Sequence, residues 1–224
     1  MIRTNHLREL ERIEHCTLAG IDAADAVLDG VLRALAPGDA SDECPAVALC
    51  AELVARCRET QAAIVTVIAR QAPVAGDLRM LLALVDANRR IEGVGDQIVT
   101  IAAHVPRDIP DGALDVELLD DLVAMGELVR EQLQAAKRSF AMADVALAER
   151  LRDEDLRVDR LEARVVRRGV QVGTTRERRQ WAIDMVLIAS CLERAGGHAV
   201  GIARHAASIG RRPRGGAPLG ASPP

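Results

Sequence analysis

Residues 91–104 read IEGVGDQIVTIAAH, and residues 192–205 read LERAGGHAVGIARH. At a constant offset these two lines share six identical positions in fourteen, from Glu92 and Glu193 to His104 and His205. Two copies of one motif at such a distance indicate an internal repeat. Around the first copy, apolar residues recur every three or four positions, which is the spacing of a helix. The sequence therefore predicts two similar halves that each carry this motif on a helix.

The composition favours an all-α protein. The chain has 224 residues, and its aromatic residues are limited to Phe140 and Trp181. Strands usually depend on aromatic and β-branched residues, whereas Ala, Leu, Arg and Glu favour helices. The formal net charge of −4 gives no strong basic field for binding nucleic acid. The most apolar stretches, AAIVTVIA and MLLALV, are too short to span a bilayer and the first residues lack a signal core, so we expect a cytoplasmic protein.

Breaks in the helical pattern divide each half into three helices. Proline and glycine interrupt the pattern at 36–45, 71–79 and 106–112, and a glycine-containing loop precedes the last helix. The expected helices cover residues 5–36, 46–70, 78–105, 116–150 and 177–209, and the fourth either continues or restarts to reach residue 168. We therefore predict six helices in tandem, with a first three-helix repeat at 1–106, a second at 113–209 and a disordered tail at 210–224.

A row of polar side chains marks the third expected helix. Asn88, Glu92, Asp96 and Thr100 follow one another at intervals of four, which places them on one helix face. Carboxylate and amide oxygens suit hard cations such as iron, manganese or magnesium. The sequence thus offers Glu92, Asp96 and Asn88 as metal ligands. The alternative is a solvated polar face without a metal.

The second copy changes this row to Ala189, Glu193, Gly197 and Gly201. A glycine inside a helix costs about 1 kcal/mol relative to alanine, so these glycines predict close approach of a neighbouring helix. One carboxylate offers a hard cation too little negative charge to leave its water shell. We therefore expect any metal to bind beside Glu92 and Asp96 rather than beside Glu193.

Three further groups have two interpretations each. Asp155 and Asp159 are also four residues apart, and either face a metal or form salt bridges on an exposed face of a highly charged segment. His104 and His205 close the two motifs, and either cap their helices or bind metal. The five cysteines contain no CxxC pair and are expected as small buried thiols rather than as metal or redox groups.

Several segments resemble one known family. RQAPVAGDLRMLLALVDANRRIEGVGDQIVTIA resembles the QxPVAxDLR…ERIGDHAxNIA signature of the PhoU family, the accessory regulators of bacterial phosphate uptake. MVLIASCLERAGGHAVGIARH is similar to the second ERIADHAxNIA copy, and residues 155–162 resemble the DxxVDxLE piece between the two copies. The resemblance covers residues 1–207, nearly the whole expected fold.

The resemblance implies a tandem of three-helix bundles without catalytic activity. Family members bind metal clusters through an ExxxD motif in each half. The first motif falls on Glu92 and Asp96, whereas the second keeps Glu193 and has Gly197 in place of the Asp. The resemblance thus implies an iron, manganese, zinc or magnesium ion at the first repeat.

The resemblance also implies a function in phosphate uptake and phosphate-starvation signalling. The protein is expected to be an adaptor between the ATPase of the phosphate ABC transporter and a membrane sensor histidine kinase. We expect a homodimer that reaches the membrane only through these partners and does not bind nucleic acid.

Two other functions stay open at this point. One is a metal-dependent enzyme, although a two-metal catalyst needs about four to six positioned side chains and the polar row supplies two carboxylates. The other is a helical scaffold that has lost the metal and keeps only its partner surfaces.

Overall fold

The computed structural model describes residues 2–35, 46–73, 75–106, 109–110, 115–172 and 175–209. Helices make up almost all of this part of the chain, and it contains no strand. In chain order they are α1 (Ile2–Arg33), α2 (Ala46–Gln71), α3 (Ala75–His104), α4 (Val116–Met142), α5 (Val145–Gly169) and α6 (Arg176–Ile209). The all-α prediction is confirmed. The expected tail at 210–224 lies outside the described residues.

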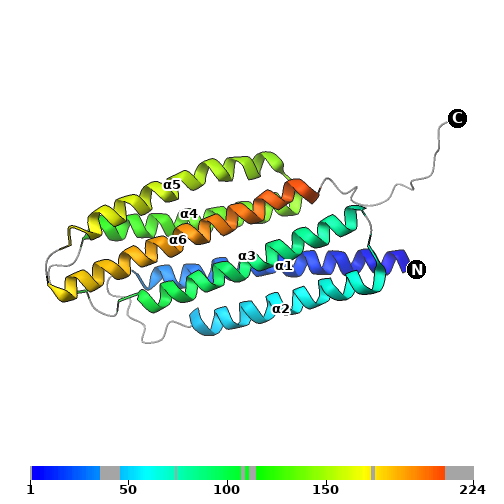
Figure 1. The fold of residues 1–224 in the computed structure, drawn as a ribbon, viewed down its shortest axis with the longest axis horizontal. Helices are drawn as coiled ribbons and strands as arrows, with labels where there is room; N and C mark the ends of the chain where they lie inside the picture. The colour runs from blue at the N-terminus through cyan, green and yellow to red at the C-terminus, as the bar shows by residue number, and fades with distance from the viewer. Residues whose placement is uncertain are drawn as a thin grey trace.

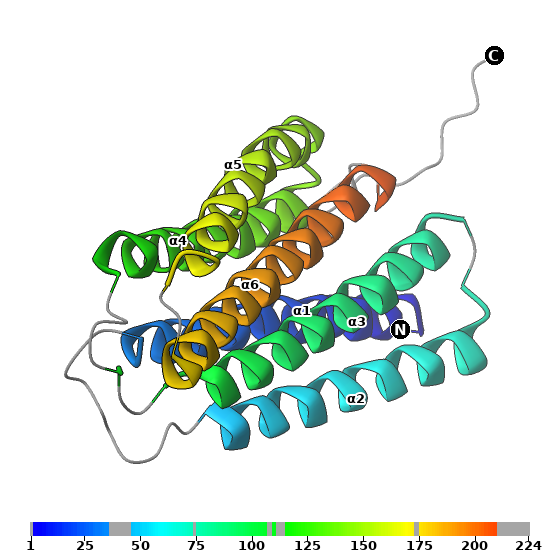
Figure 2. The same cartoon turned by 60° about the vertical axis from the view of Figure 1, so that its left-hand side comes forward.

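The helices form two three-helix bundles that lie side by side (Figures 1 and 2). Helices α1, α2 and α3 contact one another, as do α4, α5 and α6. The two bundles meet where α3 packs along α6 and where α1 packs against α4. Buried residues of all six helices form one hydrophobic core, which includes Ile101 and Ile202 from the two motifs. The predicted tandem of two three-helix repeats is therefore confirmed.

The long helix predicted after residue 116 is in fact two helices. Ala143 adopts a left-handed backbone conformation with φ 51°, which ends α4. Asp144 then accepts a hydrogen bond from the backbone nitrogen of Leu147 at 3.0 Å and begins α5 as its N-cap. Ser139 tightens the turn by donating its hydroxyl to the Asp144 carbonyl at 2.8 Å. Of the two alternatives left open by the sequence, the restart is correct.

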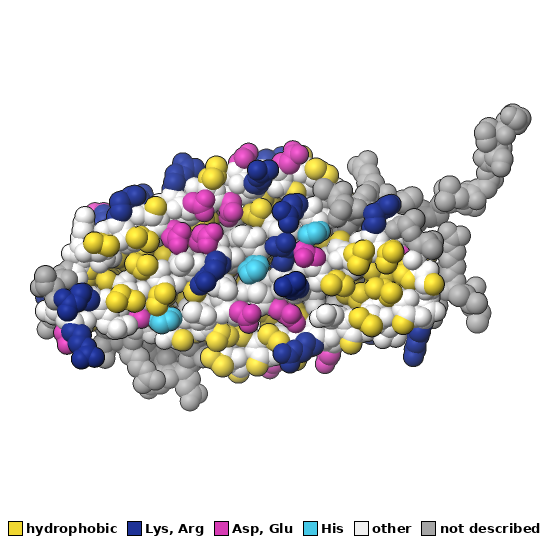
Figure 3. All heavy atoms as spheres, viewed as in Figure 1, with side chains coloured by type: hydrophobic (Ala, Val, Ile, Leu, Met, Phe, Trp, Pro, Cys, Tyr) yellow, Lys and Arg dark blue, Asp and Glu magenta, His cyan; other side chains and the backbone are white. Residues whose placement is uncertain are grey.

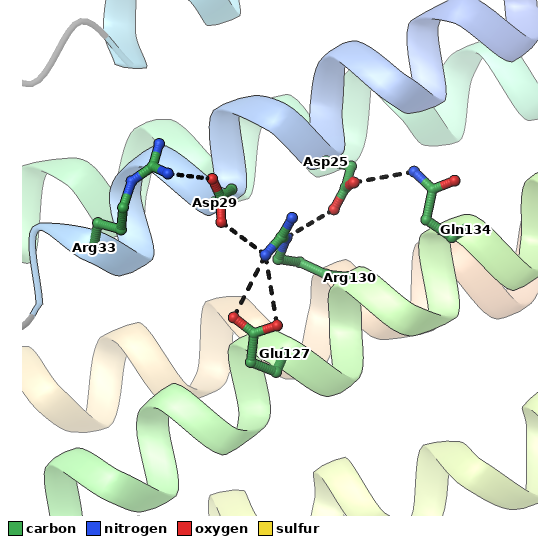
Figure 4. Close-up of polar contacts among 6 residues, drawn as sticks. All are labelled: Asp25, Asp29, Arg33, Glu127, Arg130 and Gln134. Atoms are coloured by element: carbon green, nitrogen blue, oxygen red, sulfur yellow. Dashed lines mark hydrogen bonds and ion pairs between the residues drawn. The ribbon is translucent and has the colours of Figure 1, made fainter.

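A charged network joins the two bundles between α1 and α4 (Figure 4). Arg130 of α4 lies between Asp25 and Asp29 of α1, at nitrogen–oxygen distances of 2.9 and 2.7 Å. Gln134 also donates to Asp25, and Arg33 pairs with Asp29. The three central side chains are each less than a third exposed. Their interaction is therefore less screened by solvent than that of a fully exposed ion pair.

Helix α6 packs against α4 and α5 of its own bundle and against α3 of the first bundle. It is also the one helix of the described chain that is long and apolar enough, by length and composition, to cross a membrane, over Arg176–His205. Within the bundle, 56% of that apolar span is buried. More than half of these residues therefore belong to the protein core, as expected for a helix that packs against three others.

Candidate functional site

One face of the molecule is built from α5, α6, α3 and α2, in that order across it (Figure 1). Acidic side chains gather on this face over the line between α5 and α6, and others lie over α2 and α3 (Figure 3). Histidine and arginine side chains lie between these two groups, along α3 and α6 (Figure 3). All residues predicted as a site belong to α3, α5 or α6. This face is therefore the candidate functional site.

The polar row of α3 divides into buried and accessible parts. Asn88 is buried, and its Nδ2 donates to the backbone carbonyl of Cys57 in α2 at 2.6 Å. Thr100 donates its hydroxyl to the Asp96 carbonyl at 3.0 Å. Both side chains thus bond to the backbone. The Glu92 carboxylate is half-buried, and that of Asp96 is exposed.

The thiol of Cys57 lies near Glu92. Burial and the Glu92 charge raise the pKa of Cys57 to about 12, so the thiol stays protonated and is a poor metal ligand. The buried side chains of α2 are apolar groups, thiols and Thr60, so α2 adds no buried carboxylate to the row. Buried thiols are confirmed for Cys50, Cys57 and Cys191, whereas Cys16 is exposed. Position 44 lies outside the described residues.

The second half gathers four carboxylates, which we call the acidic cluster: Asp155, Asp159 and Glu162 of α5, and Glu193 of α6. Burial and the three α5 charges raise the pKa of Glu193. Burial and the Asp159 charge also raise the pKa of Asp155, against the effect of a hydrogen bond. Among the described residues, neither Asp155 nor Asp159 forms a salt bridge, so the expected salt-bridged face is wrong. The treatment of Glu193 as a lone carboxylate is also wrong.

The missing side chain at Gly196 leaves room for the buried amide of Gln132 beside the acidic cluster. Gln132 of α4 donates its Nε2 to Asp155 at 3.1 Å. Its Oε1 is buried and has no hydrogen-bond partner in the described part of the chain. A Cβ at position 196 would lie 2.7 Å from Gln132 Oε1 and 3.2 Å from an Asp155 carboxylate oxygen. Glycine therefore gives this amide and carboxylate the room to meet.

The histidines that close the two motifs join the two halves. His104 at the end of α3 lies 2.9 Å from the carboxylate of Asp184 in α6. In the reciprocal position, His205 of α6 lies 2.6 Å from the carboxylate of Asp86 in α3. Burial raises the pKa of Asp86, but the hydrogen bond from Arg90 and the charges of His205 and other basic groups lower it below its ordinary value. The sequence indicates caps or metal ligands at these two positions and gives no signal for the pairs with Asp184 and Asp86.

Two glycines allow side chains to cross the seam between α3 and α6. His198 of α6 lies over Gly93, where a Cβ would come within 2.5 Å of the imidazole Nε2. Burial and the Arg90 charge lower the pKa of His198. Arg90 of α3 lies over Gly201, and a Cβ there would overlap its guanidinium. The predicted close approach of a neighbouring helix is thus correct at Gly201, where the Arg90 side chain of α3 makes the contact. It is wrong at Gly197, where nothing lies within 4 Å of a Cβ.

The side chains of the acidic cluster are of the kind that binds hard cations, but they are not arranged as a metal site. Carboxylate and amide oxygens are the usual ligands of such ions. In the described residues, however, no three His, Cys, Asp or Glu side chains are grouped so that they could hold a metal ion. A cation at this place would therefore have to draw the carboxylates together.

Comparison with known proteins explains the repeat. A family model described as the PhoU domain matches residues 21–105 and matches again at 122–206. The chain belongs to the PhoU family. The first PhoU domain contains Glu92 and Asp96, and the second contains the whole acidic cluster. The two motifs are therefore equivalent parts of two PhoU domains.

Individual PhoU proteins are similar over most of the chain. Those of Mycobacterium bovis and Mycobacterium tuberculosis, named phosphate-specific transport system accessory protein PhoU homolog 2, are each 30% identical over 200 residues, which is 85% of this chain and 87% of theirs. The crystal structure of PhoU from Pseudomonas aeruginosa has a TM-score of 0.80 at 22% identity and covers 90% of this chain and 97% of its own. The phosphate transport system regulatory protein PhoU from Streptococcus pneumoniae has a TM-score of 0.78 at 18% identity, with 91% and 96% covered. The two crystal structures support the fold.

Proposed function

We propose that this protein is an accessory regulator of phosphate-specific transport. The observation that carries the proposal is the PhoU domain found in both halves, together with mycobacterial relatives named as accessory proteins of that transport system. These relatives are similar along nearly the whole folded chain rather than over one segment. An accessory role therefore suits the protein as a whole.

In finer detail, we propose that the protein acts as a cytoplasmic, non-catalytic adaptor. It would contact the ATPase of the phosphate ABC transporter and the cytoplasmic part of a phosphate-sensing histidine kinase, in the form of a homodimer. Two bundles that share one hydrophobic core offer two surfaces side by side, which suits binding of two partners. A metal-dependent enzyme is the alternative, and the adaptor is favoured because the relatives that cover most of the chain are named as accessory proteins.

A bound cation is a separate part of the proposal, and we place it at the acidic cluster. Within the part of the chain that the structure describes, the four carboxylates form no salt bridge and Gln132 Oε1 has no hydrogen-bond partner, so these oxygens are available as ligands there. The first half provides Glu92 and Asp96, with Asn88 bonded to the backbone. A hard cation such as manganese or magnesium would relieve the repulsion within the cluster. The proposed site thus lies in the second repeat, whereas the sequence predicts a metal in the first repeat, beside Glu92 and Asp96.

Co-purification tests the adaptor role. The full chain is immobilised and mixed separately with the transporter ATPase and with the soluble part of the kinase from the same organism. Retention of either partner at moderate salt supports the proposal, and a helical protein of similar charge serves as the control for non-specific binding. If neither partner is retained above this control, the adaptor role is refuted.

A further inference from the structure

A groove runs between α4 and α5, the first two helices of the second bundle. It has a volume of about 700 Å³ and is open to solvent along its length. Its apolar lining includes Leu128 of α4 and Leu161 of α5, both partly buried against the core. The groove is separate from the acidic cluster, since none of the four clustered carboxylates lines it.

One wall of the groove is a row of arginines on α5: Arg157, Arg160, Arg164 and Arg167. Their spacing of three, four and three residues places them on one side of the helix, over about 15 Å. The acidic cluster uses other positions of α5, toward α6, so this helix separates its charges between two neighbours. Positive charge is therefore concentrated on the side of α5 that lines the groove.

Most of this positive charge is not neutralised by other side chains. Arg164 pairs with Asp121 of α4. Arg160 bonds to the backbone carbonyl of Leu156 in its own helix at 2.9 Å. Within the described residues, Arg157 and Arg167 form no salt bridge or hydrogen bond. Three guanidinium groups are thus available to an acidic partner.

The other wall, on α4, has the opposite charge. Glu127 and Glu131 line it, and Glu127 has a loose contact of 3.5 Å with Arg130. A ligand that fills the groove must therefore present acidic groups to α5, apolar groups to the floor, and neutral or basic groups to α4. An anionic membrane surface presents one sign of charge and would be repelled by the glutamates. An amphipathic helix can present all three kinds of side chain on one face.

We propose that the groove between α4 and α5 binds an amphipathic helix of a partner protein. This helix carries an apolar stripe, an acidic edge that contacts Arg157 and Arg160, and a neutral or basic edge that contacts the glutamate wall. Charge complementarity decides the orientation of the helix, and burial of its apolar stripe supplies most of the affinity. The inference does not depend on the proposed role in phosphate transport, because the groove and its charges are features of the chain itself.

The test uses a synthetic peptide of about 15 residues, long enough to cover the arginine row as a helix. The peptide has a leucine stripe with glutamates along one edge and lysines along the other, and its binding to the full chain is measured by fluorescence anisotropy. We expect saturable binding to the wild type. The double variant Arg157→Glu, Arg160→Glu should bind about tenfold or more weakly. Arg138→Glu, which makes half of that charge change on an exposed part of α4 outside the groove, should bind as the wild type does.

Two controls separate this explanation from others. A peptide with lysines on both edges tests whether apolar contact alone suffices. Vesicles of phosphatidylcholine and phosphatidylserine test a membrane surface. No binding of the mixed-charge peptide, equal binding of the all-lysine peptide, or full retention by the double variant would each overturn the proposal. If circular dichroism shows that the double variant is misfolded, Arg157→Gln with Arg160→Gln removes the same charges without adding acidic ones. Vesicle binding that needs these arginines, without peptide binding, would assign the groove to lipid instead.

Discussion

Replacing Gly197 with alanine should stabilise the protein. Gly197 lies within α6 on the exposed surface, and nothing lies within 4 Å of the place where a Cβ would stand. The new methyl group therefore meets no neighbour and reduces the entropy that the chain loses on folding. Alanine is favoured over glycine inside a helix by about 1 kcal/mol. For a protein of this size, such a gain raises the Tm by about 2–4 °C.

The same substitution at Gly201 gives the matched comparison, one helical turn further along α6. Its gain in helix propensity is offset, because the new Cβ would overlap the Arg90 guanidinium. Arg90 would have to move away and lose its hydrogen bond of 2.6 Å to Asp86. This loss costs about 1 kcal/mol, so we expect a net change near zero or slightly destabilising.

Urea unfolding followed by circular dichroism measures both variants against the wild type. An increase in the free energy of unfolding for Gly197→Ala alone supports the reasoning. Equal gains in both variants would show that Arg90 does not need the space at Gly201. A loss of stability in Gly197→Ala would contradict the open surroundings of position 197.

Three further predictions concern charge. Arg130→Ala should lower the free energy of unfolding in a urea titration by about 2 kcal/mol, since it leaves two shielded α1 carboxylates without their shared partner. Lys137→Ala removes a more exposed ion pair, with Asp22, and should cost less than about 0.5 kcal/mol in the same titration. Equal losses in the two variants would contradict this difference. In metal-free buffer, Glu193→Gln should raise the free energy of unfolding at pH 7, because the raised pKa of Glu193 makes its ionised form the unfavourable one in the folded state. That gain should vanish in thermal melts below the ordinary pKa of 4.5, where the carboxyl is protonated in the unfolded state too. The amount of manganese that stays bound after dialysis, measured by elemental analysis, should fall in Glu193→Gln and stay close to the wild-type level in Asp96→Asn. The opposite ranking would place the metal beside Glu92 and Asp96, as the sequence predicts.

Periodicity and repetition predict most of the fold. The repeated motif implies two equivalent helices, and the buried Ile101 and Ile202 occupy equivalent places in the core. The end of α4 is harder to predict, since alanine has no preference for the left-handed conformation that Ala143 adopts, and local hydrogen bonds of Ser139, Phe140 and Asp144 hold this turn. Asp144 was the available signal, because an aspartate before an apolar helical run is a common N-cap.

The candidate site was less predictable, because it depends on which helices become neighbours. Spacing along one helix correctly places Glu92 and Asp96 one turn apart, but it cannot show that three α5 carboxylates lie near Glu193. It also cannot show that His104 pairs with a residue 80 positions away. Such contacts arise from the packing of one bundle on the other, and local sequence carries no signal for them.

The central claim is that the protein regulates phosphate transport. The most direct measurement is the activity of a phosphate-starvation reporter, together with phosphate uptake, in cells that lack this chain and are grown with ample phosphate. Our account predicts that the reporter becomes active or uptake changes in these cells, and that the full-length wild-type chain restores the normal state. Unchanged reporter activity and unchanged uptake, in both ample and limiting phosphate, would contradict it.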